Sequence, residues 1–179
     1  MIGILAMLAC SGSPPVDSAV SDTAPQEPRE PGSYEHLLLF DLTSGAGGRT
    51  AGADIDSVLL NKPSGDYWAA TVVDELLLGA DNEHLDSSHA LGERDSDCET
   101  NVFASLGGAG GYLLLSFGEG ITIDNGDIIT VFEVGSVMCP ESGASDELWE
   151  IGAMDGTDLN DAQYIGQSWG MGEISVNTL

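Results

Sequence analysis

Short apolar segments separated by turns constrain the fold of residues 35–179 more than any other feature of the sequence. No apolar periodicity long enough for an ordinary helix of about 12 residues interrupts them. One helical turn is expected at 86–91, with Asp86 as its N-cap. Strands are expected near residues 36–42, 54–60, 67–74, 101–105, 112–117, 127–134, 147–154, 162–166 and 173–177. Many short strands joined by glycine-rich turns predict an all-β jelly roll, or β-sandwich.

The first ten residues, MIGILAMLAC, are uncharged and form an apolar run too short to span a membrane. They fit the apolar core of a secretory signal. The sequence Met7-Leu8-Ala9-Cys10 resembles the lipobox of bacterial lipoproteins. That resemblance implies a signal peptide over 1–9, lipid attachment at Cys10, and export to the outer membrane or cell surface of a Gram-negative bacterium.

Residues 11–34 contain five of the seven prolines, together with many Ser, Thr, Ala and acidic residues. A segment of this composition buries too little apolar surface to offset the entropy of ordering. We therefore expect three parts: a signal peptide over 1–9, a lipidated and disordered linker over 10–34, and one β-sandwich domain over 35–179.

The charge of the chain excludes one class of partner. It has 30 Asp and Glu against 4 Lys and Arg, a formal net charge of −26. Binding to nucleic acid requires a basic surface that displaces counterions from phosphates. We expect no nucleic-acid partner, and membrane contact through the lipid anchor only.

The cysteine count favours a disulfide bond. If Cys10 carries lipid, Cys98 and Cys139 remain as an even pair in an exported chain. Their bond would close a loop of about forty residues, worth ~3–4 kcal/mol in the chain-entropy picture.

Four segments follow one another along the chain: GADIDSVLL, DYWAATVVDELLLGADNEHLDSSHALG, FASLGGAGGYLLLSFGEGITIDNGDIITVFEVG and ELWEIGAMDGTD. Their order resembles that of a domain of bacterial cell-surface proteins. This order resembles the galactose-binding-like, or discoidin-type, β-sandwich, over about residues 52–158. The resemblance implies the jelly roll of many lectins and carbohydrate-binding modules, in which a structural Ca²⁺ is common.

Catalytic motifs give little support to an enzyme. Residues 166–170, GQSWG, fit the G-x-S-x-G pattern, but neither His nor Asp follows them, as that pattern requires. We interpret these glycines as turn residues. A glycoside hydrolase would need two acids held close together in a cleft, and 30 acids supply such pairs by chance. We expect no enzymatic activity and keep an acid-pair hydrolase as the second alternative.

Oxygen-rich loops suggest a structural Ca²⁺, which takes six to eight oxygen ligands. The alternative is that Asp and Asn serve the turns themselves through side-chain to backbone hydrogen bonds. Three loop clusters offer such oxygens: Asp81, Asn82, Glu83 and Asp86; Asp95, Asp97 and Glu99; and Asp155, Asp158, Asn160 and Asp161. The candidate ligands are Asp81, Asn82 and Asp86 in the first cluster, which is preferred, and Asp155, Asp158 and Asn160 in the third.

Three residues are candidates for ligand binding. Alternation along 127–134 places Glu133 on the same face as two apolar residues, so it is expected to be partly buried, with loop amides or a ligand as its partner. Trp169 is the first candidate for an exposed aromatic residue that stacks against a sugar ring, followed by Tyr164 and Tyr112. The alternative for each of them is packing within the fold. Trp68 and Trp149 are expected in the core.

These observations predict a surface-anchored, non-catalytic binding module whose ligand is a glycan or another surface protein. The first alternative is a structural or assembly protein of the cell envelope with no small ligand. Each of these predicts a different surface: an exposed aromatic beside polar loops for the module, and an exposed apolar patch or unpaired edge strand for the scaffold. The oligomeric state is left open.

Overall fold

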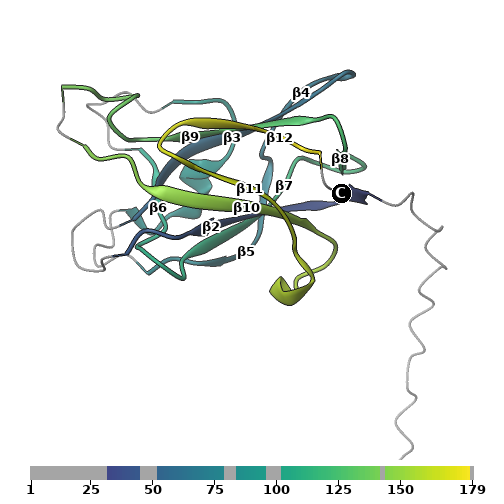
Figure 1. The fold of residues 1–179 in the computed structure, drawn as a ribbon, viewed down its shortest axis with the longest axis horizontal. Coiled ribbons are helices and arrows are strands. Elements are labelled where there is room, and N and C mark those ends of the chain that lie inside the picture. Colours follow the sequence, from purple (N-terminus) through teal and green to yellow (C-terminus); the bar gives the residue numbers. More distant parts are fainter. Residues whose placement is uncertain (1–31, 45–51, 79–83, 96–101, 142–143, 178–179) are drawn as a thin grey trace, which may run out of the picture.

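The computed structural model describes residues 32–44, 52–78, 84–95, 102–141 and 144–177. They form two antiparallel sheets packed face to face (Figure 1). The first sheet has the order β11-β10-β2-β7-β5. Its strands are β2 (His36–Asp41), β5 (Thr71–Leu76), β7 (Tyr112–Ser116), β10 (Leu148–Met154) and β11 (Gln163–Trp169).

The second sheet has the order β12-β9-β3-β4, with a further short strand, β6, paired to β3. Its strands are β3 (Asp54–Lys62), β4 (Gly65–Trp68), β6 (Ala104–Ser105), β9 (Ile128–Glu133) and β12 (Gly172–Ser175). A separate pair joins β1 (Ser33–Tyr34) to β8 (Ile123–Asp124). Two 3₁₀ turns, η2 (Ser87–Ala90) and η3 (Leu159–Asp161), complete the described elements.

The core lies between the two sheets and follows from alternation along the central strands. In β2, Leu37 and Leu39 are fully buried against the second sheet, which contributes Ile129 and Val131 from β9. Trp149 of β10 is also fully buried. Apolar side chains at every second position thus close the sandwich, since burial of such area is the main favourable term in folding.

Several predictions from the sequence are confirmed. The described residues are all-β, with η2 as the expected helical turn, and Asp86 caps it by accepting a hydrogen bond from the backbone N–H of Ser88. The expected strand at 67–74 instead divides at Ala69. The Ala69 N–H donates to Val58 in the second sheet, and the Ala70 N–H donates to Ser116 in the first. The chain crosses between the sheets there.

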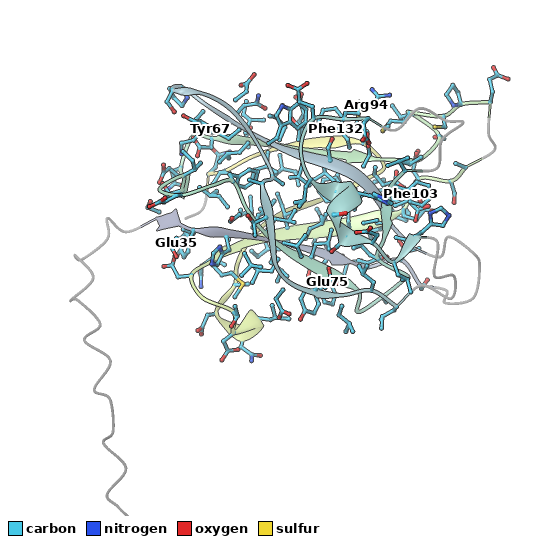
Figure 2. All side chains as sticks on the ribbon, turned by 180° about the vertical axis from the view of Figure 1, so that it is seen from behind. Glu35, Tyr67, Glu75, Arg94, Phe103 and Phe132 are labelled. Atoms are coloured by element: carbon cyan, nitrogen blue, oxygen red, sulfur yellow. The ribbon has the colours of Figure 1, made fainter. Side chains whose placement is uncertain are left out.

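The prediction that Trp68 lies in the core is wrong. Tyr67 pairs with buried Leu60 and packs against the core, so its neighbour Trp68 points to the outer face of the second sheet. There the ring of Trp68 lies 5.7 Å from that of Phe132. Figure 2 shows Tyr67 and Phe132 on this sheet.

The two ends of the sandwich are distinct. The first described residues and the β1–β8 pair lie at one end, and β6 lies at the other, which we call the β6 end (Figure 1). Strand β1 begins two residues before the expected domain boundary at 35. Lys62 fixes β8 with its Nζ, 2.6 Å from carboxylate oxygens of both Asp124 and Asp127. Within the described ranges, no helix is long and apolar enough to cross a membrane.

Candidate ligand-binding groove

A groove of about 250 Å³ lies on the outer face of the first sheet, between β2, β10 and β11. Strand register explains its position. Gly152 of β10 pairs with Leu38 on one side and with Tyr164 on the other. Because Gly152 has no side chain, a gap remains between those two larger residues. The groove is lined by Leu38, Phe40, Glu150, Ile151, Gly152, Leu159, Ala162 and Tyr164.

Gly152 forms the floor of this gap. A β-bulge between Ile151 and Gly152 shifts the register with β11 and brings Tyr164 opposite the glycine. A Cβ added at Gly152 would stand 3.1 Å from the carbonyl oxygen of Gln163 and 3.4 Å from the Cβ of Ala162. Any larger side chain there would therefore occupy the groove itself.

The turn η3 closes one end of the groove. Leu159 and Ala162 pack against a small apolar cluster on the outer face of the sheet, made of Leu38, Leu114 and Met154. Asp158 starts this turn by accepting hydrogen bonds from the backbone N–H and the side-chain amide of Asn160. The cap keeps the turn, and so the wall of the groove, against the sheet.

The carboxylate of Glu150 is the acidic group at the other end of the groove. Glu150 pairs across the strands with Phe40, and Phe40 pairs with Tyr112 of β7. Tyr112 in turn donates a hydrogen bond of 2.9 Å to Asp74. Tyr164, on the opposite wall, is 58% exposed, so its ring can contact a bound molecule. Aromatic walls with one carboxylate acceptor suit a small ligand that has apolar faces and hydroxyl groups.

Of the three expected ligand-binding residues, only Tyr164 lines the groove. Trp169 is 61% exposed on the same strand but lies five residues further along and does not line it. Glu133 is fully buried, on the face that its alternation predicted, at the β6 end. Sequence analysis missed Phe40, Glu150 and Gly152. Alternation along HLLLFD does place Phe40 opposite the core residue Leu39, but it carries no information about neighbouring strands.

The candidate calcium ligands that can be placed take part in turns. Asp86 accepts from the backbone and the hydroxyl of Ser88, which lowers the pKa of Asp86. Asp155 accepts a hydrogen bond from the backbone N–H of Glu35. Backbone and side-chain hydrogen bonds from Asn160 likewise lower the pKa of Asp158. Calcium at these positions stays a prediction, since Asp81 and Asn82 lie outside the described residues.

Two other predictions concern cysteines and the G-x-S-x-G pattern. Cys10 and Cys98 lie outside the described residues, whereas Cys139 is buried, with 2% of its surface exposed. The Cys98–Cys139 bond stays a prediction. Ser168 pairs with Trp149 inside β11, in a regular antiparallel ladder and not at a strand-to-helix turn. This position lacks the geometry of a nucleophile elbow.

Comparison of the chain with known protein families, with curated proteins and with solved structures found no match. The function is therefore argued from the groove.

Proposed function

We propose that this chain is a surface-displayed, non-catalytic binding module that takes a glycan in the groove beside Tyr164. One observation carries the proposal: an exposed tyrosine lines a groove together with a glycine and the carboxylate of Glu150, on an outer sheet face. A sugar ring presents C–H groups to an aromatic face and hydroxyls to acceptors such as Glu150. The groove, at about 250 Å³, lies just below the ~300–1,000 Å³ of pockets for drug-sized ligands, which suits one sugar residue of a longer chain.

The proposal includes the type of β-sandwich and the attachment of the chain to the cell surface. A sandwich of galactose-binding-like type agrees with the order of sequence segments and with the all-β architecture. Lipid at Cys10 and a linker over 11–34 would hold the module at the cell surface. Cys10→Ser should release the protein from membranes into the soluble fraction, and retention on membranes would contradict the anchor.

The acids do not favour a hydrolase. Glu150 is the one acid among the residues that line the groove, whereas acid-pair hydrolysis needs two. The pKa is most strongly raised for Glu133, which is fully buried and out of reach of a substrate.

A role in assembly is the second candidate, because one edge of the first sheet is apolar and exposed. Strand β5 is at that edge, and Val73, Leu76 and Leu78 are 36%, 45% and 45% exposed. An open edge strand with apolar side chains can pair with another chain. Figure 2 shows Glu75 of this strand at the margin of the molecule.

The decisive experiment is a glycan array probed with the purified chain, repeated with Tyr164→Ala. Truncating an aromatic anchor in a pocket costs on the order of 2 kcal/mol, so retention on the captured glycans should fall by about tenfold or more. Trp169→Ala is the matched control, since it removes an equally exposed aromatic from the same strand outside the groove. Equal losses for the two variants, or capture of no glycan, would contradict the proposal.

A Leu76→Asp variant tests the assembly role separately. If the β5 edge binds a second copy of the chain, this variant should shift the self-association seen in sedimentation toward monomer. Glycan retention should then be unchanged, because Leu76 does not line the groove.

A further inference from the structure

The groove beside Tyr164 contains one charged group, the carboxylate of Glu150. In the described part of the chain, none of the other residues that line the groove is charged, and none is a histidine. Glu150 is half-buried within β10, and its cross-strand neighbours are Phe40 on β2 and Gln167 on β11. Because both neighbours are neutral, the groove itself supplies no positive charge to this carboxylate.

The cations of the folded chain lie elsewhere. The described ranges contain one lysine, Lys62, and one arginine, Arg94. The Nζ of Lys62 lies 2.6 Å from carboxylate oxygens of two aspartates, and the Nε of Arg94 lies 3.7 Å from Asp56. Neither residue lines the groove, so within these ranges a cation that pairs with Glu150 has to come from the ligand.

The charge of the whole chain acts on a ligand in the same direction. The formal net charge is −26, and the summed field of such a protein attracts cations and repels anions. A sugar with a carboxylate, sulfate or phosphate group would also meet the like charge of Glu150 inside the groove, which is costly. The groove therefore disfavours acidic glycans, and neutral and cationic sugars remain.

The chemistry of the walls favours the cationic class. A hydrogen bond between an ammonium group and a carboxylate is roughly twice as strong as one between neutral groups. The half-buried position of Glu150 strengthens this attraction relative to open water. Phe40 and Tyr164 add aromatic walls, and an aromatic ring attracts a cation that lies within about 6 Å of its centre.

The strand geometry places the carboxylate within reach of a bound sugar. Glu150 and Gly152 are two residues apart on β10, so they share the outer face at a separation of about 7 Å along the strand. Gly152 in turn lies between Tyr164 and Leu38. A sugar ring seated at Gly152 can therefore contact Tyr164 and direct one ring substituent toward Glu150.

We propose that the groove prefers amino sugars whose amine is free, of the glucosamine class, and that the ammonium group of the sugar pairs with Glu150. This inference rests on the glycan function proposed above and specifies its ligand. In a neutral sugar a hydroxyl group donates to the same carboxylate, with a weaker bond. N-acetylation removes the charge of the amine and adds bulk, so the acetylated sugar should bind less well.

The test is a glycan array printed with matched pairs of short oligosaccharides, probed with the purified chain at about pH 6, where amino groups carry a proton. Each pair contains the same glucosamine, galactosamine or mannosamine chain with free and with N-acetylated amines, and oligosaccharides of uronic acids are printed beside them. The free amine should be retained about tenfold better than its acetylated partner in at least one pair. Added NaCl at about 0.5 M should narrow this preference, because salt screens a partly exposed ion pair.

Two variants separate the groove from the general attraction of an acidic protein for cations. Glu150→Gln keeps the shape of the side chain and removes its charge, so this variant should retain the two members of each pair alike. Glu173→Gln is the matched control, since it makes the same change at an exposed position on β12 of the second sheet. It alters the net charge equally and should keep the preference. Urea unfolding of both variants checks that the fold is retained.

The outcomes distinguish this inference from the proposed function. Equal retention of free and acetylated partners by the wild type, or equal loss of the preference in the two variants, would overturn the inference. If the array captures neutral or acidic glycans through Tyr164 without a preference for amines, the glycan function stands and the amino-sugar inference alone fails. Capture of no glycan would overturn both.

Discussion

The groove beside Tyr164 and the carboxylates of the β6 end differ in what satisfies their polar groups. In the groove, the side chain of Tyr164 is exposed to solvent. At the β6 end, Asp41 and Glu133 are both fully buried, with opposite outcomes. Asp41 accepts three backbone hydrogen bonds of 2.7 to 2.9 Å, from Thr43, Ala53 and Gly108. Glu133 accepts none from the described backbone, and its carboxyl group lies against that of Glu147.

This difference shows that burial alone does not tell what an acid does. Asp41 is structural because it supplies the acceptor for three N–H groups in loops that could not pair elsewhere. Burial, and then the neighbouring Glu147, raise the pKa of Glu133 to about 10, so Glu133 carries a proton in the folded state at neutral pH. Tyr164 can contact a ligand because most of its surface is exposed in the groove.

The largest effect on stability is expected for Asp41→Ala. It leaves three backbone donors without their acceptor, and each unsatisfied buried group costs about 1–3 kcal/mol. The free energy of unfolding should fall by about 4 kcal/mol or more in urea titration. A loss below about 1 kcal/mol would show that Asp41 does not hold these loops.

The next effect concerns pH and Glu133. A raised pKa means that the folded state keeps a proton that the unfolded state loses, so stability falls as pH rises. Without divalent cations, the free energy of unfolding should decline from pH ~4 through about 7 for Asp54 and toward about 10 for Glu133.

Glu133→Gln removes one of these protons from the balance. Its stability should decline less steeply, by up to about 5 kcal/mol between about pH 5 and 9, because one fully linked proton is worth ~1.4 kcal/mol per pH unit. The measurement is urea unfolding at several pH values. Parallel pH profiles of the two proteins would contradict the raised pKa of Glu133.

Gly152→Val should reduce both the stability of the fold and the retention of glycan in the groove. The new side chain meets the carbonyl of Gln163 and the Cβ of Ala162, so we expect a stability cost of ~1–2 kcal/mol. It also fills the groove, so glycan retention should fall at least about tenfold. Gln167→Val, on the adjacent strand outside the groove, should retain binding. If Gly152→Val binds as well as the wild type, the groove is not the ligand site.

Tyr164→Ala should have the smallest effect on the fold. Exposed substitutions usually change stability by less than about 0.5 kcal/mol, so its unfolding curve should match that of the wild type. A clear loss of stability would mean that Tyr164 is part of the packing, and the contrast with the β6 end would fail.

Local patterns in the sequence carried the predictions that succeeded. Alternation over 128–133 placed Glu133 inward, and the Asp86 cap followed from its position before a short turn. The failures share one cause, since alternation does not reveal which face of a strand meets which neighbour. Trp68 was assigned to the wrong face for that reason. The groove depends on the strand register that brings Leu38 and Tyr164 to either side of Gly152. Leu38 lies more than a hundred residues before Gly152 in the sequence, so no local pattern reports that register.

The structure of the chain in complex with an oligosaccharide captured on the array tests the central claim most directly. The account predicts one sugar ring stacked on Tyr164 above Gly152, with a hydroxyl hydrogen-bonded to Glu150. A sugar seated on Trp169 or along the β5 edge, with the groove unoccupied, would contradict it.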